Sequence, residues 1–274
     1  MALATLRAAD APATLAPCGA WSKRMYDDRY VAFVDILGFT EIVRKTEHDT
    51  TDRRYDALVK TLTEIGSFDE ETINESDDFK FQSFSDSVIM STATTQNGLL
   101  HLLHLISNLS IHLLSNGGLL MRGAIAKGKL HHDQSVMFGP AFLAAYYTES
   151  HIAKYPRVVL NREVYQDFQT LAPRLHPQVL LADDGPPYLH VFARFRLLNE
   201  GQPTPDHLNS PEAILAQTCQ SSIQNLLNES IYEPRHYEKL RWLAIYWNST
   251  VLTGTAGAGL GMIVLPVSRN MARQ

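Results

Sequence analysis

Cysteine is scarce in this sequence, and long runs of positive charge or of apolar residues are missing. Cys18 and Cys219 lie far apart, without a Cys-x-x-Cys or Cys/His pairing, which indicates neither a disulfide framework nor a structural zinc site. The net charge is -5 with no long Lys/Arg run, so we expect no nucleic-acid partner. The longest apolar stretches are broken by polar residues or are too short to span a bilayer. We therefore expect a cytoplasmic protein without a membrane segment.

The chain nevertheless has ample material for a core, because 45% of its 274 residues are hydrophobic. The composition suggests three parts. Residues 1–25 are rich in Ala and Pro and are predicted to be a flexible lead-in, residues 26–200 form the main domain, and residues 201–274 form a helical extension packed on that domain. The extension could cover the sheet or add to a subunit interface.

Apolar periodicity and turn residues predict an α+β fold, with a mixed, mainly antiparallel sheet layered with helices. A strand is expected at 29–34, and a helix begins near Thr40 after a Gly38 turn. "FKFQSFSDSVIMST" predicts a hairpin with Asp86 at its tip. The remaining predictions are helices at 55–65, 97–114 and 139–154, strands at 119–130 and 157–160, and helices starting near Ser210 and His236.

Two acids stand at predicted strand ends. If Asp35 and Asp86 meet at one edge of the sheet, their repulsion at about 4 Å amounts to roughly 4 kcal/mol at an effective dielectric near 20. Either one acid takes up a proton or a divalent cation lies between them. Two carboxylates that hold magnesium or manganese are typical of phosphoryl-transfer chemistry. Each acid taken alone could instead be a helix cap or a turn residue.

The motifs "FVDILGF" (Phe33 to Phe39), "FSDS" around Asp86 and "MRGAIAKGKL" resemble the class III nucleotidyl cyclases. The resemblance implies a cyclase-like, ferredoxin-like core within residues 26–200, which would be the catalytic domain. It also implies that Asp35 and Asp86 ligate two divalent cations, Mn²⁺ or Mg²⁺, and that the Ile36 carbonyl assists one of them. The reaction would be attack of a ribose 3′-hydroxyl on the α-phosphorus, with loss of pyrophosphate.

Further residues are candidates for contacting the nucleotide. Gly38 allows close approach of the backbone, and amides near Phe39 and Thr40 could receive a polyphosphate. Arg122 and Lys127 could contact phosphate or developing charge, or could form surface ion pairs. Tyr146 and Tyr147 could narrow the base pocket or pack in the core. The residues expected to bind substrate are Phe33, Gly38, Phe39, Thr40, Gln82, Lys127 and Tyr147, with Asp35, Asp86 and Arg122 as catalytic residues.

The sequence also departs from the purine-specific members of that family. Gln82 and Val136 stand where those enzymes read the base, and Leu143 and Tyr147 stand where they carry the Asn and Arg that support the transition state. The cluster "FSDS", "MRGAIAKGKL", "MFGPAFLAAYYTES" and "YPRVVL" resembles instead the bacterial pyrimidine cyclases of the Pycsar anti-phage system.

This second resemblance implies UTP, or less favourably CTP, as substrate and a cyclic pyrimidine nucleotide as product. The product would activate a separately encoded effector. A homodimer with active sites at its interface is also implied. Two alternatives stay open: a catalytically silent cyclase-fold nucleotide sensor, favoured by the missing Asn and Arg, and a metal-dependent NTP phosphohydrolase.

Overall fold

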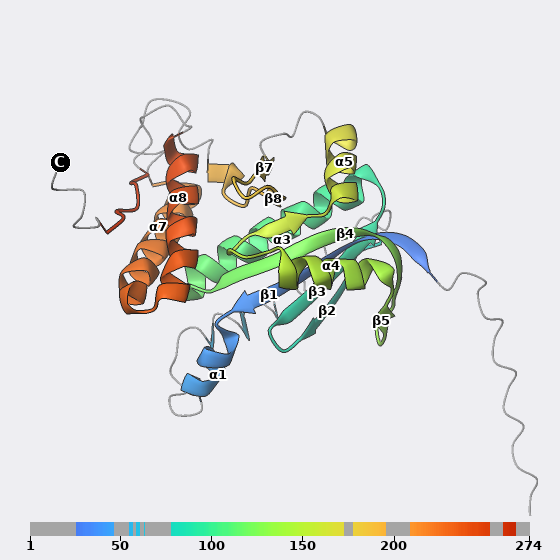
Figure 1. The fold of residues 1–274 in the computed structure, drawn as a ribbon, viewed down its shortest axis with the longest axis horizontal. Coiled ribbons are helices and arrows are strands. Elements are labelled where there is room, and N and C mark those ends of the chain that lie inside the picture. Colours follow the sequence, from blue (N-terminus) through green and yellow to red (C-terminus); the bar gives the residue numbers. More distant parts are fainter. Residues whose placement is uncertain are drawn as a thin grey trace, which may run out of the picture.

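A computed structural model describes residues 26–46, 78–172, 178–195, 209–252 and 260–266, with isolated positions between 55 and 63. The expected lead-in at 1–25 and most of the expected helix at 55–65 lie outside the described residues. Figure 1 shows a long twisted sheet with helices on both faces and a helical pair at one end.

Seven strands form the sheet in the order β2-β3-β1-β4-β6-β8-β7, and the short β5 pairs with β4 outside this path. Only β4 and β6 pair in parallel, so the prediction of an α+β fold with a mainly antiparallel sheet is confirmed. The strand bounds are β1 Asp27–Leu37, β2 Lys80–Phe84, β3 Ser87–Ala93, β4 Leu120–His132, β5 Met137–Phe138, β6 Val158–Leu160, β7 Val179–Leu181 and β8 Pro187–Leu189.

The helices bound the sheet on its two faces and at one end (Figure 1). Their bounds are α1 Phe39–Thr46, α3 Gln96–Gly117, α4 Pro140–His151, α5 Arg162–Leu171, α7 Pro211–Glu229 and α8 Pro234–Leu252, with a 3₁₀ turn at Ser230–Tyr232. Of these, α5 was not expected, and neither were β5, β7 and β8.

Strand β1 is the centre of the core because both of its edges are paired, with β3 and with β4. Its side chains alternate between the two faces. Tyr30, Ala32 and Val34 join the main core cluster with Leu99 and Leu102 of α3. On the opposite face, which we call the α4 face, Val31 and Phe33 of β1 lie in a smaller cluster with Ala141 and Ala145 of α4. Any further odd-numbered β1 side chain therefore also points to the α4 face.

Helix α3 is the one described helix whose length and composition could cross a membrane. Half of its most apolar window is buried in the protein, as in the core helix of a globular domain. Its end is set by Gly118, whose φ of 62° is left-handed and whose N–H donates to Leu114. The helix thus extends three residues beyond the predicted range of 97–114.

The C-terminal helices cover one end of the sheet and of α3 (Figure 1). Ile223 of α7 and Trp247 of α8 share a buried cluster with Ile111 and Leu114 of α3. Both helices start close to their predicted positions, α7 after the Ser210 cap and α8 at Pro234. The described part of the extension therefore packs on the sheet domain, while the proposed division near residue 200 stays a prediction.

Arg157, just before β6, joins α8 to the sheet through the contacts of its side chain. Its side chain is fully buried, and its guanidinium donates two hydrogen bonds to Asp184, at 2.7 and 2.6 Å. The same guanidinium carbon lies 5.4 Å from the ring centroids of Tyr155 and Trp242 and 5.6 Å from that of Tyr188. Trp242 belongs to α8, so cation–π contacts join the helix to this arginine.

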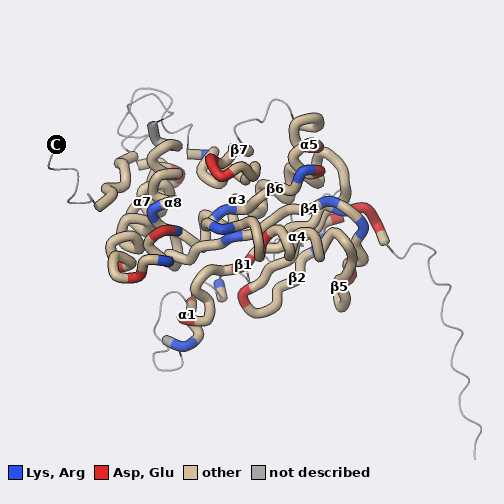
Figure 2. Tube along the Cα trace, viewed as in Figure 1, with Lys and Arg blue, Asp and Glu red and all other residues tan. Residues whose placement is uncertain are grey.

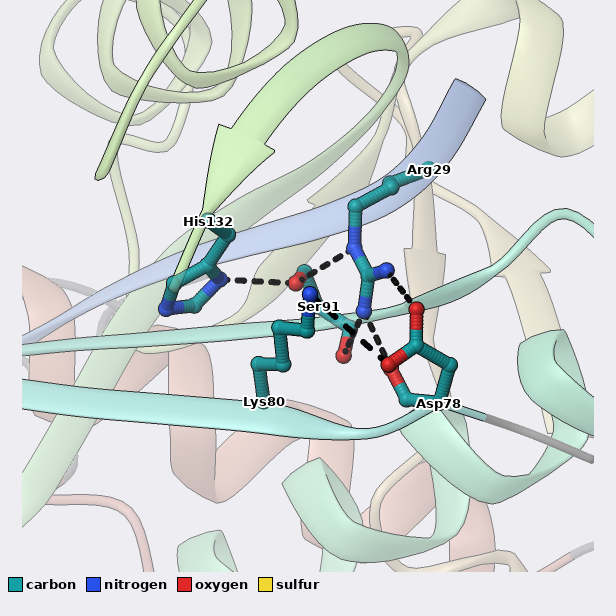
Figure 3. A network of polar contacts seen from close by, with 5 residues as sticks. All are labelled: Arg29, Asp78, Lys80, Ser91 and His132. Carbon is teal, nitrogen blue, oxygen red and sulfur yellow. Dashed lines mark hydrogen bonds and ion pairs between the residues drawn. The ribbon is translucent and has the colours of Figure 1, made fainter. Parts of the chain in front are cut away.

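A second buried polar cluster lies at the other end of β1 (Figure 3). Arg29 donates to Ser91 Oγ at 2.9 Å and pairs with Asp78, and Ser91 Oγ lies 2.8 Å from His132 Nδ1. Lys80 lies 3.7 Å from Asp78. Burial, then the charges of Arg29 and Lys80, lower the pKa of His132 to about 4. Arg29 and Asp35 are six residues apart on one strand, or about 20 Å, so this cluster is remote from the acids.

Candidate active site

Asp35 lies inside β1, not after its end as predicted. The strand continues to Leu37 because both neighbours extend along it: Asp35 pairs with Ser87 of β3 and with Arg122 of β4. Alternation along the strand places the Asp35 side chain on the α4 face, two positions from Phe33. The carboxyl group is thereby held between two neighbouring strands and is 20% exposed.

The hairpin between β2 and β3 brings Asp86 to Asp35. Its turn consists of Ser85 and Asp86, and Ser85 adopts a left-handed φ of 57°. The Ile36 N–H donates to the Asp86 carbonyl at 3.0 Å, which fixes the turn against β1. The Asp86 carboxyl group is close enough for its charge to raise the pKa of Asp35. The structure thus brings together two acids that are distant in sequence.

The electrostatics of this pair are unfavourable at neutral pH. Burial raises the pKa of Asp35 to about 6, and the charges of Asp86 and then Glu149 contribute in the same direction. Arg122 opposes them and lowers this pKa. Asp35 thus interacts with two further acids and one arginine, and a proton or a cation can offset the repulsion between the acids.

Arg122 links the acids to helix α4. Its Nη2 lies 3.6 Å from Asp35 Oδ2, and its Nε lies 2.6 Å from Glu149 Oε1. The second contact is an ion pair whose angle falls outside that of a hydrogen bond. Glu149 is 3% exposed, and a buried acid of this kind needs a charged partner. Glu149 lies within the motif "MFGPAFLAAYYTES", which is the one sequence signal that points to it, although the motif alone indicates no individual role for this residue.

The backbone of the turn after β1 is accessible to a ligand. Gly38 has a φ of 81°, which disfavours other residues, and a Cβ built at this position would meet no atom within 4 Å. Its carbonyl accepts a hydrogen bond from the Glu41 N–H at 3.0 Å, at the start of helix α1. Phe39 packs against the core and Thr40 is exposed. Gly38 and Thr40 are accessible beside the acids, whereas Phe39 serves mainly to pack.

Gln82 and Phe33 share the α4 face. Gln82 pairs with Ile89, and Ile89 pairs with Phe33 on its other side. The Gln82 Oε1 atom is buried and has no hydrogen-bond partner among the described residues. A buried oxygen without a donor favours a ligand group at this position. Phe33 itself packs edge-on against Tyr146, with centroids 5.4 Å apart.

Two of the residues predicted to bind substrate, Lys127 and Tyr147, make other contacts in the structure. Lys127 points to the face that carries α3 and α5, where it pairs with Asp167 at 2.6 Å and lies over the Tyr30 ring. The structure does not bring it to Asp35, because an odd position of β4 faces away from Arg122. Tyr147 is 59% exposed and stacks on His151, with centroids 4.2 Å apart. It is neither packed in the core nor lining the acid pair.

The donor set fits a hard divalent cation. Asp35 and Asp86 offer carboxylate oxygens, the ligand type that magnesium and manganese prefer. No group of three or more His, Cys, Asp or Glu side chains in the described part of the chain is arranged to hold a metal. Further ligands would therefore come from backbone, water or substrate oxygens, as is common for magnesium sites.

No protein-family model and no curated protein matches the sequence. Solved structures resemble it weakly. They include the catalytic core of a rhodopsin-guanylyl cyclase in complex with ATPαS, at 15% identity and a TM-score of 0.42, which covers 60% of this chain and 94% of that one. An adenylate/guanylate cyclase/hydrolase from Silicibacter pomeroyi has 15% identity, a TM-score of 0.38 and the same coverage.

A class III adenylyl cyclase-like ATP-binding protein from Pseudomonas aeruginosa has 14% identity and a TM-score of 0.36, over 52% of this chain and 35% of that one. At such low identities and TM-scores these likenesses carry no information on which nucleotide or reaction this chain serves.

Proposed function

We propose that this protein is a metal-dependent nucleotidyl cyclase that converts UTP, or less favourably CTP, to the 3′,5′-cyclic monophosphate and pyrophosphate. The observation that carries the proposal is the convergence of Asp35 and Asp86, which lie far apart in sequence: the Ile36 N–H donates to the Asp86 carbonyl at 3.0 Å, and the charge of Asp86 raises the pKa of Asp35. Their motifs, "FVDILGF" and "FSDS", resemble the metal-binding segments of class III nucleotidyl cyclases.

In the proposed reaction the 3′ oxygen of the ribose bonds to the α-phosphorus. The bond from that phosphorus to the bridging oxygen of pyrophosphate breaks, the bridging oxygen keeps the electron pair, and the hydroxyl proton passes to water. Two Mn²⁺ or Mg²⁺ ions, when bound, would lower the pKa of the hydroxyl and offset the triphosphate charge. Asp35 and Asp86 would hold these ions with the Ile36 carbonyl, and Arg122, fixed by Glu149, would stabilise charge on the phosphates.

The preference for a pyrimidine rests on the base-facing side chains. Gln82 presents a buried oxygen without a donor on the same face as Phe33, and a base N–H could supply the missing hydrogen bond. On that face the ring of Phe33 packs against those of Phe142 and Tyr146, and this aromatic group could limit the pocket to a small base.

The homodimer remains part of the proposal. Exposed apolar and aromatic side chains occur on α4 and at the end of β2, on the face that α4 covers; they are Phe84, Leu143, Tyr146 and Tyr147. A surface of this kind favours a protein partner. A second copy seated there would close the open side of both sites. The cyclic product would then act on a separate effector in the cytoplasm.

A catalytically silent nucleotide sensor is the second candidate. Leu143 and Tyr147 stand where class III cyclases carry an Asn and an Arg, and both are exposed, at 63% and 59%. Neither can supply the positive charge that the arginine provides, so turnover would depend on Arg122 or another cation.

One assay separates these functions. The protein is incubated with each of the four NTPs and manganese, and the products are identified by mass. We expect cyclic UMP from UTP and no product that is a linear monophosphate. Linear nucleotide products would indicate a phosphohydrolase, and nucleotide binding without turnover would indicate a sensor; either result would overturn the proposal.

A further inference from the structure

A pocket of about 490 Å³ opens beside Arg122. Four separate segments line it: β4 through Arg122, the end of α4 and the following loop through Lys154, the β7–β8 loop through Asp184, and α8 through Lys239. The C-terminal extension therefore supplies a wall of a pocket that adjoins the acid pair. Basic positions occur on both β4 and α8 at this end of the sheet (Figure 2).

The pocket has more positive than negative charge. Arg122, Lys154 and Lys239 line it, whereas its one acid, Asp184, is already engaged by both arms of the Arg157 guanidinium. Lys154 lies 3.5 Å from Glu238, but both side chains are more than half exposed, so this pair contributes little. Lys239 forms no ion pair within 4.0 Å with any residue that the structure describes.

Lys239 is also partly withdrawn from water. Burial lowers its pKa, the nearby Arg122 charge lowers it further, and Asp35 acts in the opposite direction. Lys239 thus interacts electrostatically with both Arg122 and Asp35. Lys239 has no close counter-ion in the described part of the chain and lies near a second cation, Arg122, which already pairs with Glu149 and Asp35. An anionic ligand in the pocket would offset the repulsion between Lys239 and Arg122.

Arg122 joins this pocket to the acids, since it lines the pocket and lies 3.6 Å from Asp35. We propose that Lys239 of α8, together with Arg122 and Lys154, binds the terminal phosphates of the nucleotide and holds the pyrophosphate leaving group. The C-terminal helix is then part of the substrate site and does not merely cover the sheet. This inference rests on the proposed function, and it names a positioning and binding residue that the motifs do not contain.

The test uses inorganic tripolyphosphate as a probe, so that the readout does not require turnover. Calorimetric titration of the full chain in metal-free buffer should give 1:1 binding, and Lys239→Gln should weaken it about tenfold, the effect of one charge-assisted hydrogen bond. Lys129→Gln is the matched control, because Lys129 is exposed and pairs with Asp28 at 2.7 Å. Thermal melts confirm that both variants are folded.

Two further arms separate this inference from rival results. UTP should displace tripolyphosphate from the wild type, and orthophosphate should bind far more weakly; failure of UTP to compete would indicate a separate anion site and would overturn the inference. In kinetic assays Lys239→Gln should raise the KM for UTP. Formation of cyclic product with an unchanged KM in Lys239→Gln would refute the role of Lys239 but not the cyclase function. Tripolyphosphate binding that depends on Lys239, without formation of cyclic product, would support the role of Lys239 and refute the cyclase function.

Discussion

At the scale of single residues, the placement of Asp35 beside Asp86 lowers the free energy of unfolding at neutral pH. Burial and the neighbouring charges of Asp86 and Glu149 raise the pKa of Asp35 to about 6, so its ionised form is disfavoured in the native state. Since the folded protein binds more protons than the unfolded chain between about pH 4 and pH 6, the free energy of unfolding falls as the pH rises through this window. Such an arrangement is typical of functional sites.

Asp86→Asn should therefore separate function from stability. We expect turnover to fall by about a thousandfold or more, because a metal ligand is lost and bound metal supplies several kcal/mol of transition-state stabilisation. The free energy of unfolding at pH 7.5 should rise by about 1 kcal/mol, after allowance for solvent screening, since one source of repulsion is removed. Urea unfolding measures this change, and loss of folding would mark the pair as structural.

His132 should give the opposite pH dependence. Its pKa is lowered to about 4 in the fold, so between about pH 6.5 and pH 4 the unfolded chain binds the extra proton and stability is lost as the pH falls. His132→Gln should remove about 2 kcal/mol of the difference between unfolding free energies at pH 7 and pH 4.5. Urea unfolding at these two pH values checks this. An equal pH difference in the variant and the wild type would contradict it.

At the scale of elements, local patterns predicted the parts on which the site depends. The hairpin with Asp86 at its tip and the Gly38 turn each follow from residues within a few positions of them, so the sequence alone indicates them. Glu149 and Lys239 could not be placed in this way, because their roles depend on α4 and α8 crossing the sheet next to Arg122. The sequence leaves Lys127 open between a phosphate contact and a surface ion pair, and alternation along β4 turns it to the opposite face, where it pairs with Asp167.

The attachment of α8 to the sheet should depend on Arg157. Its buried side chain joins Asp184 to three aromatic rings, so Arg157→Met should cost about 3 kcal/mol of unfolding free energy and increase amide exchange in α8. Lys129→Met, which removes a 55% exposed ion pair, should cost less than about 1 kcal/mol. Equal effects of the two substitutions would show that Arg157 is no anchor.

At the scale of the whole molecule, the exposed side chains of the α4 face predict self-association. Leu143→Arg should raise the dimer dissociation constant at least about a hundredfold, because it puts an unpaired charge in the centre of an apolar contact. Ile231→Arg is the control, since Ile231 is 50% exposed on the 3₁₀ turn at the far side of the extension. Sedimentation velocity distinguishes them, and a wild type that is monomeric at all concentrations would refute the dimer.

The central claim is that two acids from separate elements form one site for divalent cations. Electron paramagnetic resonance of free Mn²⁺, titrated with the protein in the presence of UTP, measures this most directly. We expect the wild type to remove manganese from solution, Asp35→Asn and Asp86→Asn each to lose that binding, and Asp184→Asn to retain most of it. Unchanged manganese binding in both Asp35→Asn and Asp86→Asn would contradict the claim.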